Sequence, residues 1–221
     1  IMDSVQGLSL SEYNLIVFRT IGTRLEEAIA VASFCRKKGI KYIDTYLPKM
    51  GNTKLSCAFV RWENNLPVPK TVYGPIEGML QFLPQLGLPA VLKADAGKKG
   101  RDNYLVHSEE DIRAHISKKD APTYVLQNFI PNDGDLRVLV MNNRVRMVLK
   151  RTAAANSHLN NTSQGGSVEL VAVTDLPKDA AGLSIQAAQI EKLAIAGVDL
   201  IQNKETGEYF ILEANRAPQI A

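Results

Sequence analysis

Runs of hydrophobic and polar residues alternate along the chain in a way that predicts strands and helices in turn. Residues 14–20 (NLIVFRT) and 40–45 (IKYIDT) are apolar runs of strand length, and residues 24–39 between them repeat apolar positions at helical spacing. A strand, a helix and a second strand with short connections predict a small parallel β-α-β unit. The next helical pattern covers residues 52–65, and the proline-containing residues 66–71 (LPVPKT) predict an extended connector.

The middle and end of the chain continue this alternation. Residues 108–119 carry the clearest helix signals, because Ser108 precedes acidic residues in the first turn and lysines stand in the last. Residues 136–151 predict a β-hairpin that turns at Asn142-Asn143, since asparagine tolerates positive φ in a two-residue turn. The other expected elements are helices over 75–87 and 180–195, strands over 89–95, 103–107 and 123–130, a closing hairpin over 197–215, and polar loops over 96–102 and 153–167.

Composition and charge fit a globular protein and do not indicate a macromolecular partner. The chain has 221 residues, of which 45% are hydrophobic and 22% charged, and its net charge is +3. Its basic residues are scattered, which does not favour a nucleic-acid or membrane surface but suits small anions such as phosphates. Cys35 and Cys57 have neither the number nor the spacing of a disulfide framework or a zinc site, so a cytoplasmic location is expected. The sequence is expected to be a fragment, because it starts at Ile1 and stops soon after Pro218.

The closing hairpin ends in two oxygen-bearing side chains that face the same way. Glu213 and Asn215 lie two positions apart on the predicted strand, and strand side chains alternate between faces. If residues 205–207 (ETG) form a three-residue turn, Asp199 on the preceding strand lies directly opposite Glu213. The hairpin then brings all three side chains together.

Two facing carboxylates destabilise an otherwise apolar hairpin. A hard divalent cation removes this conflict, and Mg²⁺ commonly takes one or two carboxylates together with substrate phosphates. The residues fit equally well a solvated strand end at which Asp199 pairs with Arg216 or Lys204. Metal binding and a simple ion pair are therefore both open at this point.

A second group of residues suits phosphate. Lys93 lies inside the apolar strand pattern of residues 89–95, where an ammonium group is costly unless it meets an anion. The loop that follows has backbone amides and lysines that suit phosphate groups, at Gly97, Lys98, Lys99 and Gly100. Its spacing is neither that of a P-loop nor that of a dinucleotide-binding loop, so an ordinary hairpin turn is the alternative.

The 136–151 hairpin contributes further charges. A turn at Asn142-Asn143 places Asp135 opposite Lys150, which predicts a structural ion pair. By the same count Arg137 and Arg151 fall on opposite faces, and one of them can still reach a ligand at the strand end.

In their order, these signals resemble the ATP-grasp superfamily, and most of all its RimK-like ligases, which add amino acids such as glutamate to a peptide end. The resemblance covers residues 66–221 and rests on VLKADAGKKGRDNYLV, YVLQNFI, GDLRVLV, VLKR, NNTSQGG, AGVDLI and LEANRAP. It implies a mixed α/β (α+β) fold in which two α+β subdomains clasp ATP, preceded by a partial Rossmann-like domain. The implied domains are a partial N-terminal domain (1–65), a small lid subdomain (66–131) and a core subdomain (132–221) whose C-terminal end is missing.

The resemblance also implies a role for each matching residue. The implied Mg²⁺ ligands are Asp199, Glu213 and Asn215. The implied nucleotide contacts, from phosphates to adenine and ribose, are Lys93, Gly97, Lys98, Lys99, Gly100, Gln127, Asn128, Phe129, Ile130 and Asp135. The implied residues at the reacting phosphate and the acceptor are Arg137, Arg151 and Asn161, with the Gly165-Gly166 loop nearby. In one departure from the family, Asn128 replaces the acid usual at the adenine hinge, which is expected to change the strength of binding.

The activity implied by the resemblance is that of an ATP- and Mg²⁺-dependent ligase that joins a carboxylate to an amine through an acyl phosphate. One or two Mg²⁺ ions are implied, with Mn²⁺ as a substitute. The implied substrates are a glutamate-like amino acid and a peptide or protein carboxylate, with no nucleic-acid or membrane partner and with a homo-oligomer allowed. The alternatives are an ATP-grasp enzyme with another acceptor, an ATP-grasp kinase, a non-catalytic nucleotide-binding module, which Asn128 and the expected truncations favour, and a plain α/β binding domain.

Overall fold

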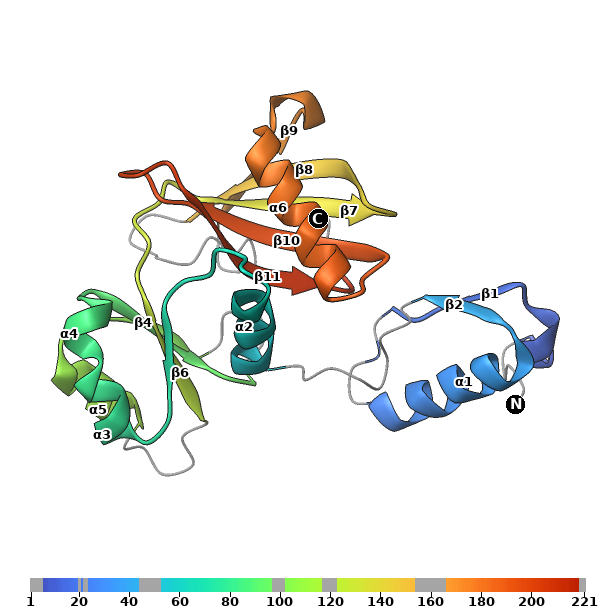
Figure 1. Cartoon of the computed structure of the whole chain (residues 1–221), viewed down its shortest axis with the longest axis horizontal. Coiled ribbons are helices and arrows are strands. Elements are labelled where there is room, and N and C mark those ends of the chain that lie inside the picture. The colour runs from blue at the N-terminus through green and yellow to red at the C-terminus, as the bar shows by residue number, and fades with distance from the viewer. Residues whose placement is uncertain are drawn as a thin grey trace.

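A small parallel unit stands at the start of the chain. The computed structural model describes residues 6–19, 21, 24–43, 53–96, 102–116, 123–153 and 166–218. After a short 3-10 helix, η1 (Leu10–Glu12), strands β1 (Leu15–Val17) and β2 (Lys41–Ile43) pair in parallel, with helix α1 (Leu25–Lys38) between them in sequence. Helix α1 ends as predicted at Gly39, whose left-handed φ of 68° suits glycine. The predicted β-α-β unit is confirmed, and it lies to one side of the other sheets in Figure 1.

The second sheet has helices on one face and a lysine on the other. It is antiparallel, in the order β3 (Thr71–Tyr73), β6 (Tyr124–Asn128), β4 (Ala90–Ala94) and β5 (Asn103–Val106). Its helices are α3 (Ile76–Gln81), α4 (Leu83–Leu86) and α5 (Glu109–Ile116). Met79 and Ile112 of these helices pack with Leu92 and Leu126 of the sheet. Because side chains alternate along a strand, Lys93 points to the opposite face.

The third sheet has helix α6 (Lys178–Ile190) on one face. It is antiparallel, in the order β11 (Tyr209–Asn215), β10 (Ile195–Gln202), β7 (Asp135–Met141), β8 (Arg144–Thr152) and β9 (Ser167–Val171). A 3-10 helix, η3 (Val173–Asp175), joins β9 to α6. Val138, Val198 and Leu200 are fully buried and pack in one cluster with Ala180 and Ala187 of the helix. The polar residues between them on the strands therefore point to the other face.

Helix α2 (Lys54–Glu63) lies between the second and third sheets in Figure 1. At its start the backbone N–H of Lys54 donates to Asp95 O (3.2 Å), just beyond β4. Near its end Arg61 forms an ion pair with Glu191 (2.6 Å), just beyond α6. Helix α2 therefore contacts the end of β4 in the second sheet and the end of α6, the helix that covers the third sheet.

Most predicted elements are confirmed, with three differences. Strands β3 and β9 were not predicted: each begins at the last residue of the expected connector (66–71) or the expected loop (153–167) and continues into residues to which no element was assigned. The helix expected over 75–87 is two short helices, α3 and α4. None of the helices in the described ranges is long and apolar enough to span a membrane.

Candidate functional site

The β7–β8 hairpin turns where predicted but pairs in a different register. Asn142 and Asn143 have φ values of 50° and 58°, as a two-residue turn of this type requires. The pairing then shifts by one residue between Leu139 and Val140, because Arg146 is an extra residue on β8. Such a bulge leaves one residue unpaired and moves every later side chain of its strand to the other face.

This shift brings Asp135 opposite Arg151. The predicted pairing of Asp135 with Lys150 is therefore wrong, and so is the prediction that Arg137 and Arg151 lie on opposite faces. All three charged residues (135, 137 and 151) share the face away from α6. The sequence count failed because it assumed a regular ladder outward from the turn.

The β10–β11 hairpin pairs Asp199 with Glu213 as predicted, but through a longer turn and a bulge that were not predicted. Its turn is one residue longer than residues 205–207, since Asn203 N donates to Glu208 O (2.8 Å) and Gly207 N donates to Asn203 O (2.7 Å). This longer turn alone would have moved the pairing by one position.

A bulge at Leu212 restores the expected pairing. Leu200 pairs with Ile211 on the turn side of the bulge, whereas Asp199 pairs with Glu213 beyond it. Asn215 lies two residues after Glu213, so it points to the same face. The predicted convergence of Asp199, Glu213 and Asn215 on one face is confirmed by this register.

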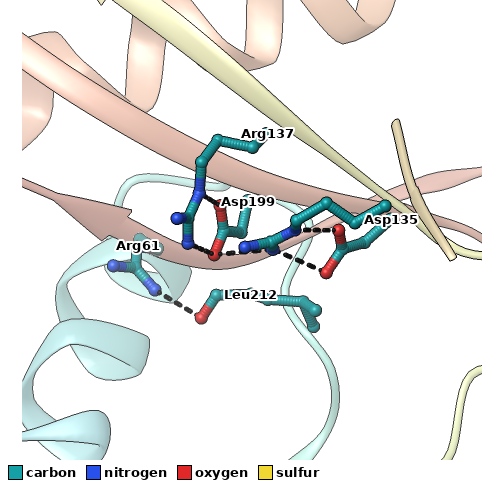
Figure 2. A network of polar contacts seen from close by, with 6 residues as sticks. Arg61, Asp135, Arg137, Asp199 and Leu212 are labelled. Carbon is teal, nitrogen blue, oxygen red and sulfur yellow. Dashed lines mark hydrogen bonds and ion pairs between the residues drawn. The ribbon is translucent and has the colours of Figure 1, made fainter. Parts of the chain in front are cut away.

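Two carboxylates and two guanidinium groups form a buried network on this face (Figure 2). Arg137 donates to both oxygens of Asp199 (2.8 Å each), and Arg151 donates to both oxygens of Asp135 (2.6 and 2.7 Å). Arg151 also approaches Asp199 at 3.0 Å. The alternative partners of Asp199 considered from the sequence, Arg216 and Lys204, are not the ones the structure gives it.

The electrostatics of the network follow from its burial. Asp135, Arg151 and Asp199 are between 5% and 7% exposed. Burial raises the pKa of Asp135 to about 6, with Arg151 opposing the shift and the charge of Asp199 adding to it. The network thus sets two carboxylates against two guanidinium groups on one sheet face.

The three predicted metal ligands differ in their surroundings. Asp199 is buried and shared by two arginines, Asn215 is half-buried, and Glu213 is exposed. No described residue forms an ion pair with Glu213, and no described group of three His, Cys, Asp or Glu side chains could hold a metal ion. Two carboxylates and one carboxamide are nevertheless oxygen donors of the kind that Mg²⁺ takes with substrate phosphates. The donor set fits Mg²⁺ in chemistry, and in this structure both oxygens of Asp199 are bound by arginines.

The charge of Glu213 acts on two lysines from elsewhere in the chain, Lys54 and Lys93. Burial and the ammonium of Lys54 lower the pKa of Lys93 to about 8, and Glu213 opposes that shift. Burial likewise lowers the pKa of Lys54, against the pull of Glu213. A phosphate group between the sheets would favour the charged form of both lysines.

Lys54 is a candidate site residue that the sequence reading missed. Its Nζ donates to Ala94 O (2.6 Å), directly beside Lys93 in the sequence of β4. A signal was present, because Lys54 follows the N-cap Thr53 at the start of α2, where a helix disfavours positive charge. A cation at that end of a helix indicates a specific anionic or carbonyl partner.

The predicted adenine hinge is the end of β6 and the residues after it. Gln127 is 7% exposed, shares the sheet face of Lys93 by register, and donates to Thr71 Oγ1 (2.8 Å). Asn128 points by register to the opposite face, and its buried Oδ1 has no hydrogen-bond partner among the described residues. Phe129 is half-buried and Ile130 is 5% exposed.

Six other residues named from the sequence lie outside the described residues. They are Gly97, Lys98, Lys99, Gly100, Asn161 and Gly165. Their roles stay predictions, as do those of the hinge residues.

Comparison with known proteins gives a family model and curated relatives. The model of the RimK-like ATP-grasp domain matches residues 51–221. A probable alpha-L-glutamate ligase of Parasynechococcus marenigrum (strain WH8102) is 31% identical over 219 residues, which are 96% of this chain and 46% of that protein. Another, from Xanthomonas oryzae pv. oryzae (strain MAFF 311018), is 27% identical over 191 residues, covering 81% of this chain and 63% of that protein. The chain therefore spans about half to two thirds of these two relatives.

Solved structures show the same fold at low sequence identity. The ATP-grasp ligase PsnB complexed with minimal precursor has a TM-score of 0.73 at 16% identity, over 97% of this chain and 72% of that one. The D-cycloserine synthetase DcsG has a TM-score of 0.69 at 16% identity, over 96% of this chain and 78% of that one. The predicted fold class is confirmed.

Proposed function

The chain belongs to the family of RimK-like ATP-grasp domains, and from this premise we propose that it carries the ATP site of a ligase that joins a carboxylate to an amine. The observation that supports this proposal best is the single sheet face that carries Asp199, Glu213 and Asn215 beside Arg137 and Arg151. Phosphoryl transfer needs charge neutralisation and positioning more than covalent chemistry. This face offers both.

The proposed reaction has two steps. The oxygen of a substrate carboxylate attacks the γ-phosphorus of ATP, which breaks the bond to the bridging oxygen and releases ADP. An amine then attacks the carbonyl carbon of the acyl phosphate, loses a proton and expels phosphate, leaving an amide. Mg²⁺ would supply charge neutralisation at the phosphate oxygens. We propose that Asp199, Glu213 and Asn215 hold one or two such ions, and that Mn²⁺ can replace them.

The arginines and lysines have separate proposed tasks. Arg137 and Arg151 would turn from their carboxylate partners toward the transferred phosphoryl group, since guanidinium binds phosphate in the same forked way as carboxylate. Lys93 and Lys54 would neutralise the remaining phosphates from the other sheet and α2. Asp135 and residues Gln127 to Ile130 would then receive the ribose and adenine. The solved PsnB complex with Mg and ADP supports the choice of nucleotide and metal.

The proposed substrates are a glutamate-like amino acid and a peptide or protein carboxylate. The names of the curated relatives support glutamate, and the precursor peptide bound to PsnB supports a peptide. We also propose that the protein is cytoplasmic and that its domains are divided after residues 65 and 131.

Isothermal titration with a non-hydrolysable ATP analogue, with and without Mg²⁺, tests the nucleotide site first. We expect Mg²⁺ to raise the affinity for the analogue. An affinity that is the same with and without Mg²⁺ would contradict the proposal. Release of ADP in the presence of glutamate and peptides then tests catalysis. An amide product identifies a ligase, a phosphorylated product identifies a kinase, and binding without turnover identifies a nucleotide-binding module.

A further inference from the structure

The bulge at Leu212 decides which side chains of β11 reach the site. Leu200 pairs with Ile211 before the bulge, and Asp199 pairs with Glu213 after it. A regular ladder would have set Asp199 against Leu212 and turned Glu213 to the α6 face. That face carries the apolar core, so the extra residue is what places Glu213 with Asp199.

A buried arginine binds the carbonyl of this bulge. The bulge interrupts the β-ladder at Leu212, so its carbonyl needs a donor from elsewhere. Arg61 Nη1 donates to Leu212 O at 3.2 Å, as Figure 2 shows. Arg61 comes from α2 and is 3% exposed. A fully enclosed guanidinium therefore contacts the residue immediately before Glu213.

Glu191 compensates the charge of this arginine. Its Oε1 accepts from both Arg61 Nε and Nη2 at 2.6 Å, and the residue is 6% exposed. Glu191 is the C-cap of α6, an end at which a helix disfavours negative charge. The dipole of α6 thus does not favour a carboxylate at this position. Because Glu191 accepts from Nε and Nη2 of Arg61, the Nη1 group is left to donate to Leu212 O.

We propose that Arg61 is a positioning residue of the metal site: held by Glu191, it binds the Leu212 carbonyl and so fixes Glu213 opposite Asp199 and Asn215 on the same face. This inference rests on the proposed function, because it assigns Arg61 to the Mg²⁺ ligands of the same site. Partners that orient metal ligands commonly change metal affinity by about 10- to 100-fold when they are lost.

The substitution Arg61→Lys separates the two roles of Arg61, the ion pair with Glu191 and the hydrogen bond to Leu212 O. Arg61→Lys keeps a positive charge for Glu191 but loses the planar fork that reaches Leu212 O at the same time. In titrations of the full chain with a non-hydrolysable ATP analogue, we expect Arg61→Lys to bind it normally without Mg²⁺. The Mg²⁺ concentration needed to tighten binding should rise about tenfold. Arg113→Lys is the control, because Arg113 pairs with Glu77 and Glu109 far from the bulge, and it should behave as the wild type.

A second variant covers the case in which Arg61→Lys does not fold. The double change Arg61→Met and Glu191→Met replaces the buried ion pair by apolar groups of similar size, an exchange that often preserves stability. It still removes the donor to Leu212 O. We therefore expect the same raised Mg²⁺ requirement in a folded protein. A wild-type Mg²⁺ requirement in either folded variant would overturn the role of Arg61.

Hydrogen exchange tests the positioning without nucleotide or metal. Amides of residues 209–215 should exchange faster in both variants than in the wild type, while residues 124–128 of β6 should not change. Unchanged exchange over 209–215 would overturn the inference. If instead the wild type binds the analogue without regard to Mg²⁺, the proposed function fails, and the exchange data still report on Arg61 and the bulge.

Discussion

Glu213 is the site residue whose removal should harm the fold least. It is exposed, and no described residue pairs with it, whereas Asp199 is buried between two arginines. Glu213→Gln keeps the shape of the side chain and removes its charge. We expect loss of Mg²⁺-dependent ATP turnover with a free energy of unfolding within about 0.5 kcal/mol of the wild type.

Glu208→Gln is the matched control for this change. Glu208 is exposed on the same hairpin, near the turn, and contacts Thr206 Oγ1. It should leave turnover unchanged. Wild-type turnover in Glu213→Gln, measured as ADP release across a range of Mg²⁺ concentrations, would contradict the assignment of Glu213 to the metal.

Lys93 should take up a proton when phosphate binds beside it. Its pKa of about 8 in the free chain, set by burial and by Lys54, leaves it about half protonated at pH 8. A bound polyphosphate favours the ammonium form, so binding near pH 8 should be accompanied by proton uptake at Lys93 and should weaken as the pH rises further. Titrations in two buffers of different ionisation enthalpy measure this uptake.

A comparison of two variants shows whether Lys93 is the group that takes up the proton. Lys93→Met should lower the proton uptake and weaken nucleotide binding. Lys150→Met removes an exposed lysine that points to the other face of its sheet, and it should change neither quantity. Equal proton uptake in Lys93→Met and the wild type would assign the proton to another group.

Pro218, three residues after the end of β11, lies close to Gly197 of β10. A substitution at Gly197 tests whether this contact holds β11 in place. Gly197 pairs with Asn215, and a Cβ at Gly197 would overlap Pro218 Cβ and lie 3.1 Å from its Cγ. Gly197→Ala must therefore displace the turn after β11. We expect it to destabilise the chain by about 1–3 kcal/mol in denaturant unfolding.

Gly182 offers the opposite result from the same chemical change. It lies in the interior of α6, and a Cβ there would meet no atom within 4 Å. Gly182→Ala should stabilise the chain by about 0.5–1 kcal/mol, because alanine loses less backbone entropy than glycine in a helix. A Gly197→Ala variant as stable as Gly182→Ala would show that the approach of Pro218 does not constrain β10.

The elements themselves were largely predictable, because hydrophobic period and capping residues are local signals. Gly39 ended α1, Ser108 preceded α5, and Asn142-Asn143 formed the expected turn. Pairing register was not predictable to the same degree, since it depends on bulges that the period does not mark. At Arg146 one bulge made the predicted face of Arg151 wrong.

On the last hairpin two errors cancelled. The turn is longer than predicted by one residue, and the bulge at Leu212 restores the pairing of Asp199 with Glu213. The contact of Arg61 with Leu212 could not be predicted, because it joins residues 151 positions apart through the packing of α2. Only the fold brings that arginine to the bulge.

The whole molecule divides its candidate site between two sheets. Lys93 belongs to the sheet that α3 to α5 cover, whereas Glu213 belongs to the sheet that α6 covers. A ligand that contacts both should therefore stabilise the chain as a unit. At a concentration of 100 times its Kd, such a ligand adds about 2.7 kcal/mol to the free energy of unfolding.

For a chain of this size that stabilisation corresponds to a rise in Tm of about 5–10 °C, because each kcal/mol shifts Tm by roughly 2–4 °C. Differential scanning calorimetry with the non-hydrolysable ATP analogue and Mg²⁺ measures it. At the same ligand concentrations, Lys93→Met and Glu213→Gln should each reduce the rise, since each removes the contact with one sheet, and chelation of Mg²⁺ should reproduce the effect of Glu213→Gln. A full rise in both variants would mean that the nucleotide does not bridge the two sheets.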